Sequence, residues 1–242
     1  MKMVAAASVA ALALAACGSS SDNTSSGSSN TSSSTKKALK VGLAYDIGGR
    51  GDQSFNDAAA AGLDKAKSEL GVTAQEAEAT SGEAESAKED RLRTLAQAGY
   101  NPIIAVGFAY ASATDKVAAE FPDINFAIVD NARGDKTPSN VHGLLFAENE
   151  GSYLVGAIAA LKSKAGNIGF VGGVQVPLIQ KFQAGYEAGA KAINPNIKIQ
   201  VKYLTQPPDF SGFTDPAKGK TAAQGMLDAG ADVIYHAAGG SG

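Results

Sequence analysis

The sequence has few of the side chains on which several common classes of protein depend. Its 242 residues include one cysteine, two histidines and no tryptophan, so an intrachain disulfide is excluded and a zinc site with the usual ligands is not expected. Basic side chains are not in excess either, because 21 Lys and Arg stand against 24 Asp and Glu. Nucleic acid, which needs a basic surface, is therefore not an expected partner. We expect no metal and no other cofactor.

Familiar catalytic and nucleotide-binding motifs are missing or incomplete. There is no G-x-S-x-G nucleophile elbow and no H-E-x-x-H metal motif. A dinucleotide-binding loop would need a third glycine after Gly49 and Gly51, where the chain has Ser54. The segment beginning at Gly219 resembles the end of a P-loop, but Thr214 stands where its first glycine belongs. We therefore predict that the protein is not an enzyme and has no catalytic residues.

The first 37 residues are typical of an export signal followed by a tether. Residues 1–16 carry one lysine and then an apolar run that is too short to span a bilayer. The run leads into Cys17 in a Leu-Ala-Ala-Cys sequence, which resembles the lipobox of bacterial lipoproteins, whose cysteine is acylated. An ordinary signal peptide with an incidental cysteine is the alternative. Residues 17–37 are serine-rich and should form a flexible tether, so we expect lipid on Cys17 to anchor the protein at the extracytoplasmic face of the cell membrane.

Beyond the tether, short β-rich runs alternate with amphipathic helical stretches. This order is typical of parallel sheets with helices on both faces. The expected strands are 39–45, 72–78, 103–106, 126–129, 141–146, 167–171, 197–203 and 233–236. The expected helices are 55–70, 83–98, 111–120, 151–161, 179–192 and 216–229. We predict two α/β lobes, 38–146 and 147–242, with a ligand crevice at the carboxyl ends of their strands.

The segment between the first expected strand and helix carries candidate binding side chains. Asp46 ends the strand, and Ser54, Phe55 and Asn56 lead into the helix. A simple structural interpretation of Ser54 is that it caps the helix from the N-cap position. Phe55 offers a stacking face, and the amide of Asn56 offers both a donor and an acceptor. The loop is therefore expected to bind a planar polar ligand.

Seven stretches of the chain, in order, carry a resemblance to a known family. They are Asp46-(x)7-Ser54-Phe55-Asn56, Phe126-Ala-Ile-Val-Asp130, and segments 151–160, 168–173, 182–189, 213–219 and 230–240. On these motifs the chain from residue 39 onward is identified as a member of the basic membrane protein family of substrate-binding lipoproteins, similar to purine-nucleoside receptors of ABC importers. The resemblance implies an α/β, type I periplasmic-binding-protein fold, in which two Rossmann-like lobes close on the ligand by a hinge.

The resemblance also implies direct ligand contacts for four side chains. Phe55 and Phe213 would sandwich the purine from opposite lobes, while Asn56 and Asp130 would form hydrogen bonds with the edges of the base. Two of these residues have simpler interpretations, because Phe213 could pack at a helix N-terminus and Asp130 could cap the loop that follows it.

Four further residues complete the candidate binding site. By the resemblance, Gly239 and Gly240 would line the ribose side of the ligand. Asp46 is a candidate for a carboxylate that shapes the pocket. Phe182 is a weaker candidate, because a phenylalanine on an apolar helix face more often belongs to the core.

The expected function is capture of a nucleoside, and of a purine nucleoside in particular, for delivery to an ABC permease. Two alternatives remain open: a nucleotide-dependent or nucleoside-processing enzyme on a Rossmann-like lobe, and a signalling lipoprotein with a degenerate pocket. Family members continue into a segment that supplies a ribose-binding carboxylate, a later lysine and strands returning to the first lobe. The resemblance thus implies that the chain is truncated after Gly242, leaves a sheet edge unpaired and binds weakly.

Overall fold

The computed structural model describes residues 38–80 and 82–242. These residues belong to one compact unit, Lys37–Gly242. The predicted signal, the lipidation site at Cys17 and the tether lie outside the described residues. In the described part of the chain, no helix combines the length and the apolar character that crossing a membrane requires.

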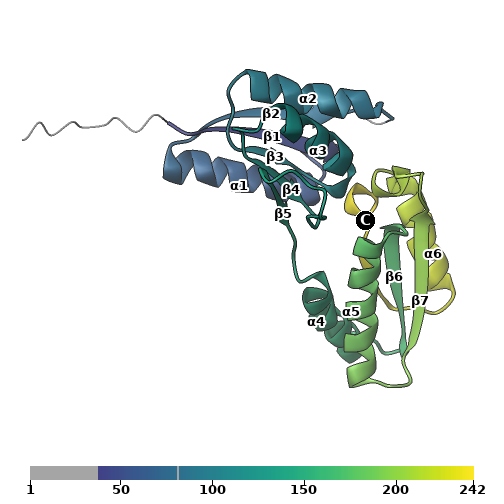
Figure 1. The fold of residues 1–242 in the computed structure, drawn as a ribbon. Helices are drawn as coiled ribbons and strands as arrows, with labels where there is room; N and C mark the ends of the chain where they lie inside the picture. Colours follow the sequence, from purple (N-terminus) through teal and green to yellow (C-terminus); the bar gives the residue numbers. More distant parts are fainter. Residues whose placement is uncertain (1–37, 81) are drawn as a thin grey trace, which may run out of the picture. The chain divides into compact units, whose positions relative to one another are not determined.

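Strands and helices alternate along the described chain, except that β5 follows β4 with no helix between them (Figure 1). The strands are β1 (Lys40–Ile47), β2 (Thr73–Ala79), β3 (Ile103–Ala105), β4 (Phe126–Val129), β5 (Val141–Leu144), β6 (Asn167–Val174), β7 (Lys198–Thr205) and β8 (Val233–Ala237). The α-helices are α1 (Phe55–Leu70), α2 (Glu85–Gln97), α3 (Ala111–Glu120), α4 (Glu148–Lys162), α5 (Pro177–Ile193) and α6 (Pro216–Asp228). Three short 3-10 helices are η1 (Phe108–Tyr110), η2 (Ser211–Phe213) and η3 (Gly239–Ser241).

The first sheet has the order β2-β1-β3-β4-β5, and all of its strand pairs are parallel. Helix α1 covers one face, where Leu63 packs in a core with Leu43 of β1. Helices α2 and α3 cover the other face, where Leu92 and Val117 pack with Ile103 of β3. Both faces are thus buried, which is the usual state of a parallel sheet.

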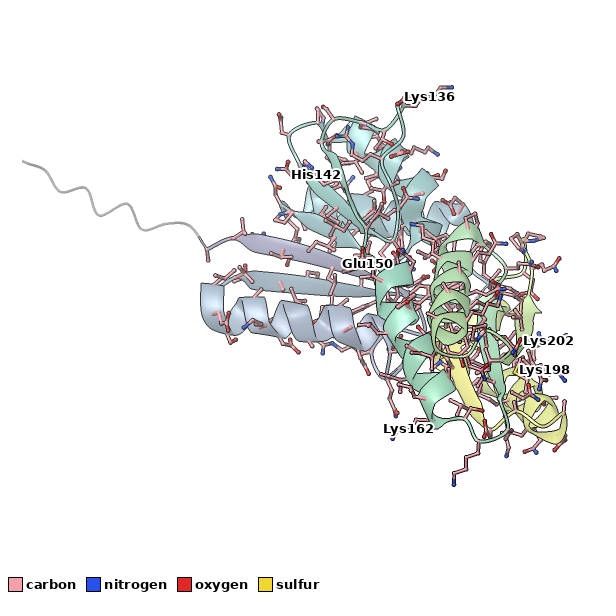
Figure 2. The ribbon with its side chains drawn as sticks, turned by 90° about the horizontal axis from the view of Figure 1, so that it is seen from below. Lys136, His142, Glu150, Lys162, Lys198 and Lys202 are labelled. Atoms are coloured by element: carbon pink, nitrogen blue, oxygen red, sulfur yellow. The ribbon has the colours of Figure 1, made fainter. Side chains whose placement is uncertain are left out.

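The second sheet has the order β7-β6-β8 and is also parallel. Its central strand β6 is buried along its whole length. Phe170 of this strand packs with Tyr186 of α5 on one face, and Val171 packs with Met226 of α6 on the other. At the outer edge of the sheet, β7 exposes Lys198 and Lys202 (Figure 2), and charged side chains of this kind discourage pairing with another strand.

Helices α4 and α5 lie side by side (Figure 1) and approach each other unusually closely. Three glycines make the approach possible, because a Cβ atom at Gly156, Gly185 or Gly189 would overlap a backbone oxygen of the opposite helix. The carbonyl oxygen facing Gly189 belongs to Tyr153. At these three positions the helices pack backbone against backbone, and a side chain larger than hydrogen would not fit.

The predicted α/β class with parallel sheets is confirmed, and the elements differ from expectation only at their ends. Helix α4 begins at Glu148 instead of residue 151, and acidic side chains in its first turn interact favourably with the helix dipole. Strand β5 ends at Leu144 instead of residue 146, and the N–H of Phe146 is directed to Oε1 of Glu148 at 3.3 Å. Helix α5 begins two residues early, at Pro177, which is suited to the first turn.

Candidate functional site

A cavity of about 420 Å³ lies at the carboxyl ends of strands from both sheets, and its volume is typical of small-molecule sites. The structure brings all eight predicted ligand-binding residues to its lining: Asp46, Phe55, Asn56, Asp130, Phe182, Phe213, Gly239 and Gly240. These residues lie close together because the loops that follow parallel strands emerge at the same edge of a sheet.

The N-terminus of α1, which carries Phe55, is capped by Asp52. One carboxylate oxygen of Asp52 accepts from the N–H of Ser54 at 2.9 Å and of Asp57 at 3.1 Å, and the other accepts from Asn56 at 2.9 Å. Ser54 occupies the N-cap position but makes no side-chain capping hydrogen bond. The interpretation that Ser54 caps the helix is therefore wrong. A carboxylate two residues earlier reaches three N–H groups, which one hydroxyl cannot do.

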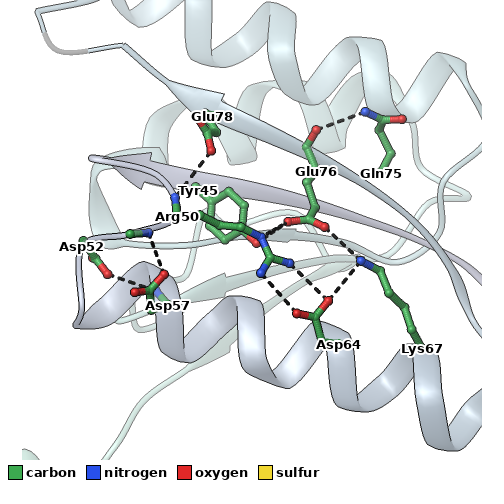
Figure 3. Close-up of polar contacts among 10 residues, drawn as sticks. Tyr45, Arg50, Asp52, Asp57, Asp64, Lys67, Gln75, Glu76 and Glu78 are labelled. Carbon is green, nitrogen blue, oxygen red and sulfur yellow. Dashed lines mark hydrogen bonds and ion pairs between the residues drawn. The ribbon is translucent and has the colours of Figure 1, made fainter.

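An ion-pair network holds the loop before α1 (Figure 3). The Arg50 guanidinium donates to Glu76 at 2.6 Å and to both carboxylate oxygens of Asp64 at 3.1 and 3.2 Å. Glu76 also accepts from the Tyr45 hydroxyl at 2.6 Å and from the Lys67 ammonium at 2.9 Å. The hydrogen bond from Arg50 is the main reason that the pKa of Glu76 is lowered to about 2. The loop is thus tied to β2 and α1 by charge.

Asn56 is a buried polar residue, with 1% of its surface exposed. Its Oδ1 accepts from the N–H of Asp46 at 3.0 Å, and its Nδ2 is directed to the carbonyl oxygens of Asp46 and Ile47, each at 3.4 Å. The amide therefore ties the start of α1 to the end of β1. This use of the side chain depends on contact between two elements and has no local sequence signal.

Two carboxylates with perturbed acidity face the cavity. Burial is the main cause that raises the pKa of Asp46. Burial also raises the pKa of Asp130 to about 6, with further contributions from Glu148 and Asp46, while Lys181 acts in the opposite direction. Asp130 has a φ of 63°, a left-handed conformation that is uncommon for residues other than glycine. Of these two carboxylates, Asp130 is the one whose charge changes near pH 6.

The opposite side of the cavity is mainly aromatic and apolar. Phe213 ends η2, and Phe182 extends from α5 at the edge of the second-sheet core, where it also lines the cavity. Phe108 was not among the predicted residues, yet it lines the cavity as well. Its ring centroid lies 6.5 Å from that of Phe213 at an interplanar angle of 72°, and 5.8 Å from that of Phe210. The only sequence signal was its position directly after a buried strand and a glycine.

The segment that resembles a P-loop has a structural explanation. Pro216 begins α6, and the Asp215 side chain caps it by accepting from the N–H of Lys218 at 3.0 Å, as expected for an N-cap residue. Gly219 lies inside the helix, where a Cβ atom would overlap the carbonyl oxygen of Ser241. Its role is thus close packing of η3 on α6. Within residues 38–80 and 82–242, no three potential ligands gather at a metal site.

Parallel α/β sheets with a small-molecule cavity at their strand ends are the arrangement of the type I periplasmic class of solute-binding proteins, to which the similar solved structures belong. The chain belongs to the family described as "ABC transporter substrate-binding protein PnrA-like", whose profile matches residues 38–242. The family resemblance inferred from the sequence is confirmed. This is a family of substrate-binding proteins and not of enzymes, so the prediction of a non-enzymatic protein is confirmed as well.

Individual relatives support this assignment. The "ABC transporter nucleoside-binding protein BmpA" of Lactococcus lactis is 36% identical over 241 residues, which cover 97% of this chain and 65% of that protein. An uncharacterized lipoprotein of Pyrococcus furiosus is 37% identical over 206 residues, covering 83% of this chain and 50% of its own. A crystal structure of an ABC transporter solute-binding protein from Aeropyrum pernix is 33% identical, with a TM-score of 0.73, over 84% of this chain and 56% of that one. This chain thus spans between half and two thirds of the length of each.

Proposed function

We propose that the protein binds purine nucleosides for an ABC importer. The observation that carries this proposal is the pair of phenylalanines, Phe55 and Phe213, that line one cavity from segments following strands of different sheets. Aromatic side chains stack on nucleobases with little dependence on the base's hydrogen-bonding pattern, at about 1–3 kcal/mol per base. A flat ligand between the two rings would use both of them.

The polar groups of the cavity suit the rest of a nucleoside. The Asp130 carboxylate, whose pKa is about 6, is mainly ionised at neutral pH and can accept hydrogen bonds from N–H groups on a base edge. Gly239 and Gly240 line the same cavity and leave room for a sugar beside the backbone. Asn56 acts on the ligand indirectly in this proposal, because its amide is occupied by the backbone of β1.

The relatives favour the same ligand class and a role in transport. The Lactococcus lactis protein carries nucleoside binding in its name, and the family name specifies an ABC transporter substrate-binding protein. In our proposal the ligand passes unchanged to the permease subunits of an importer. This role needs a cavity that binds and releases a solute, and it needs no catalytic group.

Titration calorimetry on the purified chain tests the ligand assignment. The panel contains inosine, guanosine, cytidine and free ribose, because ribose retains the sugar and lacks the base. Inosine and guanosine should bind at least about fivefold more tightly than ribose, since one stacked ring alone is worth that factor. Absence of binding by every nucleoside would contradict the proposal and favour a signalling lipoprotein with a degenerate pocket.

We further propose that lipid on Cys17 holds the protein at the extracytoplasmic face of the membrane. The support is the lipobox-like sequence before this single cysteine, together with a Pyrococcus furiosus relative named as a lipoprotein. Two or more acyl chains on one residue give stable anchoring, whereas a single chain binds marginally. In cells fed a palmitate analogue, the parent chain should incorporate label and Cys17→Ser should not. Equal labelling of the two chains would contradict the anchor.

A further inference from the structure

The ring of Phe213 rests on a glycine of the central strand β6. A Cβ atom at Gly173 would lie 2.5 Å from Cδ1 and 2.6 Å from Cε1 of Phe213, and 3.0 Å from the carbonyl oxygen of Gly212. Distances of this kind are too short for a carbon–carbon contact, so even alanine would displace the ring or the 3-10 helix that carries it. Because Gly173 has no side chain, the Phe213 ring can lie directly against the backbone of β6.

The contact continues along the backbone of η2. A Cβ atom at Gly212 would overlap the carbonyl oxygen of Gly173, so β6 and η2 meet backbone to backbone. The neighbouring Gly172 faces the other side of the sheet, where a Cβ atom would lie 2.5 Å from the Tyr203 ring, because successive residues of a strand alternate between faces. The two adjacent glycines therefore serve different purposes, and of the two only Gly173 lies against the ring of Phe213.

A second contact reaches Phe213 from η1, the 3-10 helix that follows β3 of the first sheet. Phe108 places its ring 6.5 Å from that of Phe213 at 72°, an edge-to-face arrangement that aromatic pairs favour. The position of Phe108 is itself restricted, because Gly107 has a φ of 97° and a Cβ atom there would collide with the Asp46 carboxylate. The Phe108 ring therefore follows a residue, Gly107, that packs closely against Asp46 at the end of β1.

We propose that Gly173 and Phe108 are positioning residues that fix the plane of the Phe213 ring, and that they thereby favour ligands with a flat aromatic base over those without one. This inference rests on the proposed nucleoside-binding function. Gly173 acts from behind the ring, since it does not line the cavity, whereas Phe108 holds the ring from the side. Together the two residues hold the Phe213 ring in one orientation before a ligand enters the cavity.

The test combines ligand titration with NMR signals from the Phe213 ring in the ligand-free protein. Phe108→Leu removes the edge contact, and Gly173→Ala displaces the ring. Phe108→Leu should weaken inosine binding about 2- to 10-fold, the loss expected for one aromatic pair, and Phe108→Tyr should restore it. Both Phe108→Leu and Gly173→Ala should shift the Phe213 ring signals. Phe121→Leu is the matched control, because Phe121 packs on the core of the first sheet and is not part of the cavity lining.

The outcomes separate the inference from the function on which it rests. If the parent chain binds inosine and folded Phe108→Leu binds it equally well, the inference is overturned and the proposed function stands. Unchanged Phe213 ring signals in Phe108→Leu also overturn it, whether or not any nucleoside binds. If the parent binds no nucleoside, the proposed function fails, and unchanged Phe213 ring signals in Phe108→Leu would still overturn the positioning role. Phe108→Leu alone decides the matter if Gly173→Ala does not fold.

Discussion

The two sides of the cavity are held in place by different kinds of interaction. On the side of β1, the loop leading to Phe55 is fixed by the Asp52 carboxylate and by the ion pairs of Arg50. On the side of β6, Phe213 is fixed by backbone contact at Gly173 and by the ring of Phe108. The first side should therefore respond to changes of charge, and the second to changes of side-chain volume.

The largest expected effect comes from removing either ring of the aromatic pair. Phe55→Ala and Phe213→Ala should each weaken inosine binding about 5- to 150-fold, which corresponds to about 1–3 kcal/mol of lost stacking. Free ribose, which has no base, should be affected little. Calorimetric titration of the folded variants provides the measurement. Affinities equal to that of the parent in both variants would mean that the rings serve only as core.

Sensitivity to side-chain volume is also expected where helices α4 and α5 pack against each other. Gly189→Ala should lower the free energy of unfolding by about 1–3 kcal/mol, because the new methyl group would force two backbones apart. Gly62→Ala is the matched control, since Gly62 lies inside α1 with open space around its Cβ position. That change should stabilise the protein by about 0.5–1 kcal/mol through helix propensity. Urea unfolding distinguishes them, and equal effects of the two substitutions would contradict the close approach.

A change of pH should affect the cavity through Asp130. Its raised pKa of about 6 means that the carboxylate gains a proton as pH falls through that value, and so loses charge as an acceptor. If a base N–H is bound by the ionised form, affinity for inosine should fall about tenfold between pH 7 and pH 5. Asp130→Asn should remove this dependence. His236→Gln is the control, because His236 also lines the cavity, and loss of the dependence in this variant would assign it to the histidine instead.

The smallest expected effect distinguishes the two side chains that could cap α1. Asp52→Ala should lower stability by about 1 kcal/mol, the usual loss for an N-cap interaction, and should loosen the loop beside Phe55. Ser54→Ala should change stability little, because the Ser54 side chain makes no capping hydrogen bond. Thermal unfolding of both variants provides the comparison. A larger loss for Ser54→Ala would reverse the assignment of the cap.

The alternation of elements could be read from the sequence because it depends on local patterns. Apolar runs, alanine-rich helices and terminal glycines occur within short windows, and Gly71 indeed ends α1 with a φ of 65°. Phe55 and Phe213 could be named through the family resemblance. The roles of Phe108 and Gly173 could not be predicted, because they arise where the ends of β3, β6 and η2 meet. These three segments are far apart in the chain, and no periodic pattern records their contact.

The most direct test of the central claim is a double-mutant cycle on Phe55 and Phe213 with inosine as the ligand. If one base contacts both rings, the loss of binding free energy in the double variant should differ clearly from the sum of the two single losses, by at least about 0.5 kcal/mol. Substantial single losses that add within about 0.3 kcal/mol would show that the rings act independently. Additive losses, or no loss in any of the three variants, would contradict the account in which a nucleoside is held between the two rings.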